Sequence, residues 1–507
     1  MYALPGDVLR NLSKSKLLAF RQCPKRMWLE IHEPKLREDS PHTEATFRTG
    51  HEVGDVARRL YDPKGKGALV DAQAEGYKEA LARSGTLLET AQPVFEAGFS
   101  AEGAIAFADI LLPVKRRGKL EWRMVEVKSS TSVKDYHRDD AAIQAFVARS
   151  TGLRLSSISL AHIDNTWVYP GKGDYDGLLV EQDLTQESFS REDEVKEWLN
   201  EAHAVAEQAK EPKKTTGAHC NTPFECGFAS YCRSKEPQAK HPAEFLPRIG
   251  KKIRSYIDEE KVIELKQVPD ELLNPLQLRV KQHTLSGKPY FDAKGAAAEL
   301  ARHKLPALFL DFETIYFAVP IWEGTRPYQQ VPFQFSLHRL AKSGALEHSA
   351  FLSLDGLDPS KAFAQALVGA CGKSEPVFVY NAGFEKARIT ELAARFPTLR
   401  KQLLAIAGRL VDLWPVAQNF YYHPSQEGSW SIKYVLPAVV PELRYDDLKE
   451  VQDGGMAMEA FTEAIHPQVT AERKARLEQA LLEYCKLDTY AMVRIWQVFA
   501  GRKDLKL

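Results

Sequence analysis

Apolar positions in the first third of the chain follow each other in the way that is typical of β-strands. Residues 103–113 form one apolar, strand-like segment, and residues 120–128 form a second one. Between them, Lys115-Arg116-Arg117-Gly118 is a turn signal, because charged residues and a glycine interrupt the apolar pattern. We therefore predict a β-hairpin over residues 103–128.

A second patterned stretch begins at Leu305, where an apolar run leads into Asp311. From there to about Arg502 strand-like and helix-like segments alternate, which predicts an α/β domain. The intervening segment is richer in Lys, Glu and Pro and has weaker periodicity, so we expect a partly helical connector with helix around residues 253–265. The predicted domains are 1–235, 236–304 (the connector) and 305–507.

Length and composition agree with this division. A chain of 507 residues is too long for one ordinary hydrophobic core, and 44% hydrophobic with 27% charged residues is typical of a soluble globular protein. Because no run of about 18 apolar residues occurs and the start of the chain lacks an apolar signal core, we expect a cytoplasmic protein without a membrane partner. Lys plus Arg and Asp plus Glu both total 68, which does not favour a protein that coats nucleic acid. A nuclease whose carboxylates bind metal remains compatible with this balance.

The predicted hairpin brings Asp109 near Glu126. Residues two apart on a strand face the same side, so Glu126 and Lys128 project together. Two carboxylates suit Mg²⁺ or Mn²⁺, and the lysine suits the orientation or activation of water at a phosphodiester. Solvated Glu-x-Lys pairs are common on surface strands. Here, however, Asp109 and Glu126 interrupt apolar runs, where an unpaired carboxylate is costly to bury.

Residues 12–235 resemble the PD-(D/E)XK nuclease superfamily, specifically its RecB-like branch with an iron–sulfur cluster, which includes CRISPR-associated RecB-type exonucleases and AddB. The motifs that carry the resemblance are residues 13–17 and 22–26, Gly50-His51 with Gly54, Asp109, residues 126–128 and Gln144. The resemblance implies a restriction-endonuclease-like fold with His51, Asp109 and Glu126 as metal ligands. It also implies a catalytic Lys128 and a Gln144 that helps to place metal or DNA. Glu96, in a strand-like segment, is a candidate outer carboxylate.

Four cysteines form a second feature of this region. Cys220, Cys226 and Cys232 lie close together, and Cys23 stands alone near the start. Four thiolates suit zinc or an iron–sulfur cluster, and the spacing alone does not decide between these metals or exclude free core thiols. The family resemblance implies a [4Fe–4S] cluster. Because four protein ligands leave no open position, either metal would be structural, and a redox-sensing role that gates activity is a further possibility.

A second acidic constellation lies in the last third of the chain. Asp311 and Glu313 are two apart in an apolar strand-like segment, so they share one face. Residues 377–380 form another short apolar strand, which leads to Asn381 and Glu385. In a later helix-like segment Tyr484 and Asp488 lie four apart and share a helix face.

These motifs, over residues 305–500, resemble the DEDD exonucleases of the ribonuclease-H-like superfamily, in the subgroup that uses tyrosine. The resemblance implies two divalent metals bound by Asp311, Glu313, Glu385 and Asp488, with Tyr484 positioning the attacking water. Glu385 departs from the family, which usually has Asp there, and Asp412 is an alternative or additional ligand. Lys433 is a candidate phosphate contact, and part of the aromatic content of this region suits stacking on unpaired bases.

The order of the two domains resembles a group of bacterial proteins with the same fusion. We therefore expect a Mg²⁺- or Mn²⁺-dependent nuclease that acts on DNA, with single-stranded or free ends favoured, in repair, recombination or defence. RNA is an alternative substrate. The competing hypothesis is a nucleic-acid-binding or adaptor protein in which one or both sites are inactive, and Glu385 is the feature that favours it.

Overall fold

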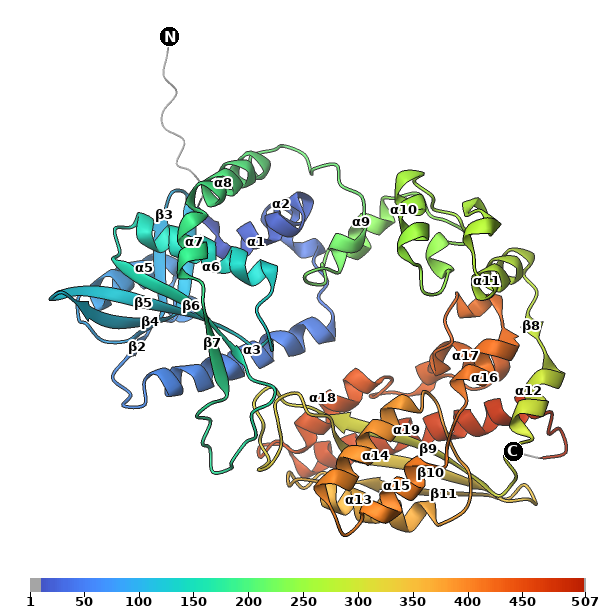
Figure 1. Ribbon diagram of the computed structural model, residues 1–507. Helices are drawn as coiled ribbons and strands as arrows, with labels where there is room; N and C mark the ends of the chain where they lie inside the picture. Colours follow the sequence, from blue (N-terminus) through green and yellow to red (C-terminus); the bar gives the residue numbers. More distant parts are fainter. Residues whose placement is uncertain (1–10, 506–507) are drawn as a thin grey trace. The chain divides into compact units, whose positions relative to one another are not determined.

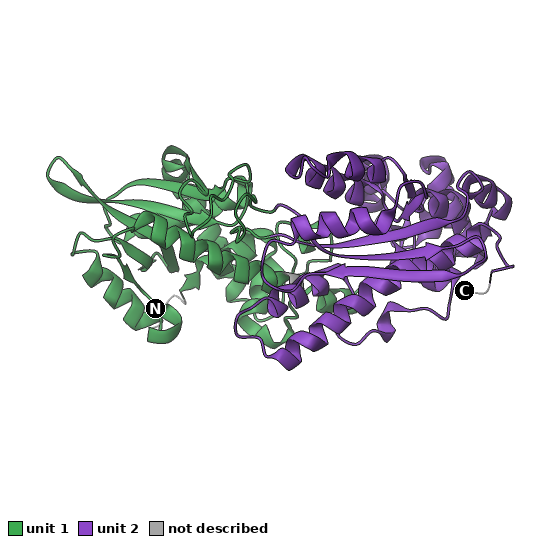
Figure 2. Cartoon of the chain, turned by 90° about the horizontal axis from the view of Figure 1, so that it is seen from below, with its two compact units in different colours: residues 1–238, 317–328 green, residues 239–316, 329–507 purple. Residues whose placement is uncertain are grey.

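The computed structural model describes residues 11–505 and has the expected α/β class (Figure 1). The chain forms two compact units (Figure 2). Unit 1 consists of residues 1–238 and 317–328, and unit 2 consists of residues 239–316 and 329–507. Within the described range, no helix is both long enough and apolar enough to cross a membrane.

Unit 1 is built on a seven-stranded sheet. Its order is β2 (Ala68–Leu69), β3 (Val94–Ala101), β4 (Ala104–Arg116), β5 (Lys119–Lys128), β6 (Leu155–Ile163) and β7 (Leu179–Asp183), and β1 (Leu12–Ser13) pairs with β4. The predicted hairpin is confirmed as β4–β5. Its turn residues Arg117 and Gly118 both have positive φ, of 49° and 73°, which suits the right-handed twist of a two-residue hairpin turn.

Helices cover both faces of this sheet. On one face α1 (Lys14–Gln22), α6 (Asp135–Ser150) and α8 (Glu192–Ala206) share a core with Trp122 and Met124 of β5. On the other face α3 (Pro41–Tyr61) places Ala57 against Val125. The even-numbered residues of β5 therefore face α1 and α6. The other helices of unit 1 are α2 (Pro24–His32), α4 (Ala72–Glu75), α5 (Tyr77–Leu87), α7 (Thr185–Ser190) and α9 (Ala229–Ser234).

Unit 2 contains a five-stranded mixed sheet. Its order is β11 (Leu346–Leu352), β10 (Val331–Leu340), β9 (Ala307–Ile315), β12 (Val377–Val379) and β13 (Leu410–Asp412). β9, β10 and β11 are antiparallel, and β12 and β13 run parallel to β9. One face carries α13 (Ser360–Cys371), α14 (Gly383–Arg395) and α15 (Arg400–Ala407), and the other carries α18 (Gly454–Ala464) and α19 (Ala471–Phe499) (Figure 1).

The predicted connector 236–304 is part of unit 2 from Ala239 onward. It contains α10 (Lys251–Glu259), α11 (Pro275–Ser286), α12 (Ala293–Leu300) and β8 (Tyr290–Phe291). A small core of its own holds the first part together, with Leu246, Ile253 and Leu265 fully or almost fully buried. β8 pairs with β14 (Tyr421–Tyr422), which lies between α16 (Trp414–Phe420) and α17 (Ile432–Val439). Hydrophobic burial and strand pairing thus bind this segment to unit 2.

The expected continuous domain 305–507 is also interrupted. Residues 317–328, between β9 and β10, belong to unit 1, where Ala318 and Val319 are buried against Val53 and Val56 of α3. These apolar side chains pack the insertion into the core of unit 1. The pattern of the sequence did not predict this exchange.

Candidate active sites

In unit 1, Glu126 lies at the centre of a buried network of charges. Its side chain is fully buried, and its Oε1 lies 2.7 Å from Nζ of Lys14 and 2.8 Å from Nζ of Lys128. The same two ammonium groups reach Asp140 of α6, at 3.1 Å and 2.7 Å. Two cations and two anions therefore alternate in one cluster, which lowers the cost of burying them.

Gln144 completes this network from the next turn of α6. Its Nε2 donates to Glu126 Oε2 at 3.0 Å and to the carbonyl of Phe107 at 2.7 Å, whereas its Oε1 is buried without a hydrogen-bond partner. The amide therefore fixes the orientation of the Glu126 carboxylate.

Asp109 lies beside Glu126, at an irregular point of the sheet. The pairing of β3 with β4 skips Glu96 and Asp109, and Glu96 has a φ of 55°. Asp109 Oδ2 accepts a hydrogen bond from the N–H of Val127 at 2.7 Å, which ties it to the strand that carries Glu126. Glu96 is close enough that the Glu126 charge contributes, after burial, to raising the pKa of Glu96.

Burial and mutual repulsion set the protonation of these acids. Burial, and after it the Asp109 carboxylate, raises the pKa of Glu126 to about 7. Burial also raises the pKa of Asp109, although Lys128 and Lys14 oppose it. For Asp140 burial acts in the same sense, but the two lysines outweigh it and lower the pKa. The two lysines therefore favour the charged form of Asp140, whereas burial disfavours the charged forms of Glu126 and Asp109.

His51 does not join this cluster. It lies on α3 with an exposed side chain, and no hydrogen bond or ion pair of the described residues links it to Asp109 or Glu126. The family resemblance implies three metal ligands. Of these, the structure brings together the two carboxylates, Asp109 and Glu126, but not His51. Sequence reasoning in turn missed the roles of Lys14 and Asp140, although Asp140 lies four residues before Gln144, on the same helix face.

The four cysteines meet in one pocket of unit 1. Cys23 lies between α1 and α2, Cys220 ends a short 3₁₀ helix (Ala218–Cys220), Cys226 follows in a loop and Cys232 lies on α9. All four line the same pocket, and all are free thiols. Lys25 and Arg26 line it as well. Four thiols are the donor set of a four-thiolate metal centre, but no three of these sulfur atoms lie within 4.8 Å of one another in the described structure.

In unit 2, β9 carries the first two acids. Leu310 and Phe312 face the core under α13–α15, so Asp311 and Glu313 face α19 on the other side of the sheet. Glu313 is 8% exposed. Burial raises the pKa of both Asp311 and Glu313 well above the usual range of a carboxyl group. The charge of Asp488 and, after it, those of other nearby acids act in the same direction.

α19 contributes Tyr484, Cys485 and Asp488. Asp488 accepts a hydrogen bond from the hydroxyl of Tyr445, and burial raises the pKa of Asp488 to about 6. Tyr484 is buried, and burial together with Asp488 raises the pKa of its phenol. Sequence reasoning missed Tyr445, which belongs to a short 3₁₀ helix (Tyr445–Asp447).

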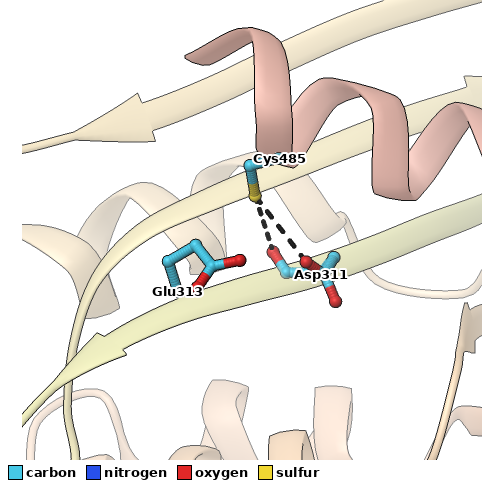
Figure 3. A group of neighbouring side chains, drawn as sticks. All are labelled: Asp311, Glu313 and Cys485. Carbon is cyan, nitrogen blue, oxygen red and sulfur yellow. Dashed lines mark hydrogen bonds between the residues drawn. The ribbon is translucent and has the colours of Figure 1, made fainter. Parts of the chain in front are cut away.

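Cys485 is the unexpected member of this group. Its Sγ points toward Asp311, at 3.8 Å from Oδ2 and 3.9 Å from the carbonyl oxygen (Figure 3). Asp311, Glu313 and Cys485 each offer one ligand atom, and these atoms lie within 4.8 Å of one another. Sequence reasoning missed Cys485, because it directly follows Tyr484 and adjacent residues of a helix do not face each other.

The two candidates for the remaining acid have different surroundings. Glu385 of α14 is 3% exposed, its Oε2 has no hydrogen-bond partner, and its charge reaches both Asp311 and Glu313. Burial, and to a lesser extent Asp412, raises the pKa of Glu385 to about 8. Asp412 accepts hydrogen bonds from the backbone N–H groups of Asn381, Ala382 and Trp414. Its carboxylate therefore holds two chain turns together, whereas the charge of Glu385 acts on Asp311 and Glu313.

Lys433 is the cation of this site. Its charge lowers the pKa of Glu313 and of Asp488, against the larger effect of burial, and its Nζ donates to the carbonyl of Gln452 at 3.0 Å. It follows Ile432 at the start of α17, and Ile432 lines a groove of about 660 Å³. Arg248, Trp414 and Asn381 line the same groove, and the guanidinium of Arg248 lies 5.5 Å from the centre of the Trp414 ring.

Two comparisons with known proteins bear on this chain. Residues 308–431 match a family described as a domain of unknown function, DUF2779. The matched segment contains Asp311, Glu313 and Glu385 and ends before α19. A protein of Mycoplasma pneumoniae described as "Uncharacterized protein MG366 homolog" is 27% identical over an alignment of 207 residues, and the match covers 37% of this chain and 31% of that protein. The chain therefore spans less than a third of the length of this relative.

Proposed function

We propose that the chain is a divalent-metal-dependent nuclease that hydrolyses DNA phosphodiester bonds, with a DEDD-type exonuclease site in unit 2 and a PD-(D/E)XK-type site in unit 1. The observation that carries the proposal is the gathering of four acids in unit 2. Asp311 and Glu313 come from β9, Glu385 from α14 and Asp488 from α19, and the charges of the other three raise the pKa of Asp311.

The excess of negative charge at this site supports bound cations. The charges of Asp488 and Glu385 raise the pKa of both Asp311 and Glu313, whereas Lys433 is the cation whose charge reaches Glu313 and Asp488. Asp311, Glu313, Glu385 and Asp488 would hold Mg²⁺ or Mn²⁺, which supplies Lewis-acid stabilisation of the attacking and leaving oxygens. The chain itself contributes Tyr484, whose buried phenol stays protonated and can donate to a water or a phosphate oxygen.

The groove lined by Ile432, the residue before Lys433, favours an unpaired strand as the substrate. Trp414 offers a ring on which a base can stack, and Arg248 offers a guanidinium for a phosphate. Glu244 also lines the groove, and its carboxylate lies 3.8 Å from Arg254, which offsets its charge. Because a duplex hides its base faces, a single-stranded end is the substrate that uses this groove fully.

In unit 1, Lys128 and the two carboxylates beside it support the same reaction, the hydrolysis of a phosphodiester bond. Asp109 and Glu126 would hold a divalent cation, and Gln144 orients Glu126 through its 3.0 Å hydrogen bond. Lys128 would exchange its contact with Glu126 for a contact with the phosphate or the water. Its bond to Asp140, at 2.7 Å, keeps it in place during that exchange.

The test is cleavage of end-labelled DNA by the purified chain. We expect single-stranded DNA to be degraded faster than duplex DNA with Mn²⁺, and no cleavage with EDTA. Lys128→Ala and Asp311→Ala then assign the cleavage to a unit, because each removes one site only. Unchanged cleavage in both single variants and in the double variant would refute both assignments. An RNA strand of the same sequence distinguishes the two nucleic acids.

A second candidate function has an observation of its own in unit 1. Lys14 and Lys128 contact both Glu126 and Asp140, so these two carboxylates have cation partners without a metal ion. Unit 1 would then bind nucleic acid without cutting it. In that case Asp311→Ala alone abolishes cleavage, and Lys128→Ala changes only the affinity for DNA.

A further inference from the structure

Cys485 places a sulfur atom among the acids of unit 2. The residue is fully buried, and its thiol lies 3.8 Å from Asp311 Oδ2 (Figure 3). Together with one oxygen of Asp311 and one of Glu313, the sulfur completes a set of three ligand atoms within 4.8 Å of one another. A site of this composition is mixed, because it combines hard oxygen donors with one soft sulfur donor.

Hard and soft donors select different cations. Mg²⁺ takes oxygen ligands, whereas Zn²⁺ and Cd²⁺ bind thiolates strongly. An ion that needs only carboxylates gains nothing from Cys485. A thiophilic ion gains a third strong ligand at the same place.

A second observation also indicates a cation here. Glu385 is 3% exposed and its Oε2 has no hydrogen-bond partner. A buried carboxylate oxygen without a partner is costly, and a bound cation removes that cost. The charge of Glu385 also contributes to raising the pKa of Asp311 and of Glu313, so this acid acts on two of the three ligand residues.

We propose that Asp311, Glu313 and Cys485 form a binding site for a thiophilic divalent cation, Zn²⁺ in particular, and that Zn²⁺ bound there blocks the Mg²⁺-dependent reaction of unit 2. The binding stands on the geometry alone, whereas the inhibition rests on the proposed nuclease function. On binding, the thiol releases its proton to the solvent and the sulfur lone pair forms the metal–sulfur bond. The ion occupies oxygens of Asp311 and Glu313 that Mg²⁺ would otherwise use.

The binding test uses Cd²⁺ as the probe, because a cadmium–thiolate bond absorbs in the ultraviolet. The full chain with its four-cysteine pocket intact is titrated with Cd²⁺ as wild type, as Cys485→Ser and as Cys371→Ser. Cys371 is the matched control, since it is buried on α13, on the opposite face of the same sheet. We expect Cys485→Ser to lose the absorbance of one thiolate, and Cys371→Ser to keep the wild-type signal.

Asp311→Asn provides a second arm in which the thiol is retained. Removal of one carboxylate ligand is expected to weaken Cd²⁺ binding at Cys485 by about tenfold or more. Circular dichroism shows whether Cys485→Ser folds. If it does not fold, the Cd²⁺ titration of Asp311→Asn tests the metal site. Equal Cd²⁺ absorbance in wild type, Cys485→Ser and Asp311→Asn would overturn the proposal.

Inhibition is measured separately, with Zn²⁺ added at a fixed excess of Mg²⁺. Relative to the Mg²⁺ activity of each variant, the half-inhibiting Zn²⁺ concentration should rise at least about tenfold in Cys485→Ser and stay unchanged in Cys371→Ser. An equal Zn²⁺ sensitivity of all three proteins would overturn the inhibitory role. Absence of all cleavage would instead contradict the proposed function, and the Cd²⁺ titration would still test the metal site.

Discussion

The two candidate sites differ in how their buried charges are balanced. In unit 1, Lys14 and Lys128 contact Glu126 and Asp140 directly. In unit 2, Glu385 Oε2 is buried without any hydrogen-bond partner. An unpaired buried carboxylate destabilises the folded protein. It is therefore a candidate functional group, because a bound ligand would supply the missing partner.

The first prediction concerns Glu385→Gln. The change removes a buried carboxylate whose pKa is raised to about 8, so the metal-free protein should unfold at a higher temperature than wild type near pH 9. The same change should reduce the stabilisation by Mn²⁺, because one metal ligand loses its charge. Thermal unfolding with EDTA and with Mn²⁺ measures both effects. Glu391→Gln on the same helix is the control, and a metal-free variant less stable than wild type would contradict the prediction.

At the scale of elements, each site arises where two or three regular elements meet. β9 supplies two acids because its side chains alternate, and α19 supplies Tyr484 and Asp488 because residues four apart share a helix face. The groove, in contrast, is formed in part by a loop. Gly428, with a φ of 80°, lies so close to Phe245 that an added Cβ would be 1.7 Å from its carbonyl oxygen. Only glycine permits this close approach of the loop that carries the groove residues.

The second prediction tests this groove as the place of an unpaired base. Trp414→Ala should weaken the binding of single-stranded DNA by about 1–3 kcal/mol, which is the usual contribution of one stacked base. Trp414→Phe should retain part of the affinity, because it keeps an aromatic ring. Fluorescence anisotropy measures the affinities in an Asp311→Asn/Lys128→Ala background, which removes both candidate cleavage sites. If Trp414→Ala binds as tightly as its parent, the strand does not stack in this groove.

At the scale of the whole molecule, the chain passes between the two units more than once. It leaves unit 2 after Tyr316 and returns at Gln329. Unit 1 is therefore completed by a segment that lies far along the sequence. A fragment that ends at Gln238 lacks Ala318 and Val319, which are buried in the core of unit 1.

The third prediction follows from this insertion. Val319→Asp places a charge in an apolar cluster and should lower the free energy of unfolding of unit 1 by on the order of 1–3 kcal/mol. Hydrogen exchange in α3, which contributes Val53 and Val56 to the same cluster, should become faster. Leu357→Asp is the control, since Leu357 is 71% exposed. Unchanged exchange in α3 would show that the insertion does not stabilise unit 1.

The fourth prediction concerns the pH dependence of stability without metal. Burial raises the pKa of Asp488 to about 6, of Glu126 to about 7 and of Glu385 to about 8, each above its value in the unfolded chain. The folded protein therefore binds more protons, and these groups favour folding most below about pH 4 and lose that contribution as the pH rises to about 8. With EDTA the unfolding temperature should fall between pH 5 and pH 8, and Mn²⁺ should reduce the fall. A flat or rising profile with EDTA would contradict the prediction.

The amino-acid sequence by itself determined the α/β class, the β4–β5 hairpin and the shared faces of Asp311 with Glu313 and of Tyr484 with Asp488. These features depend on the repeat of a strand or a helix, which acts over a few neighbouring residues. Only the tertiary structure decided that Lys14 and Asp140 surround Glu126, that Tyr445 binds Asp488, that Cys485 faces Asp311 and that His51 stays exposed. These contacts join segments far apart in the chain, and their geometry is fixed by how whole helices pack on the sheets, which no local pattern contains.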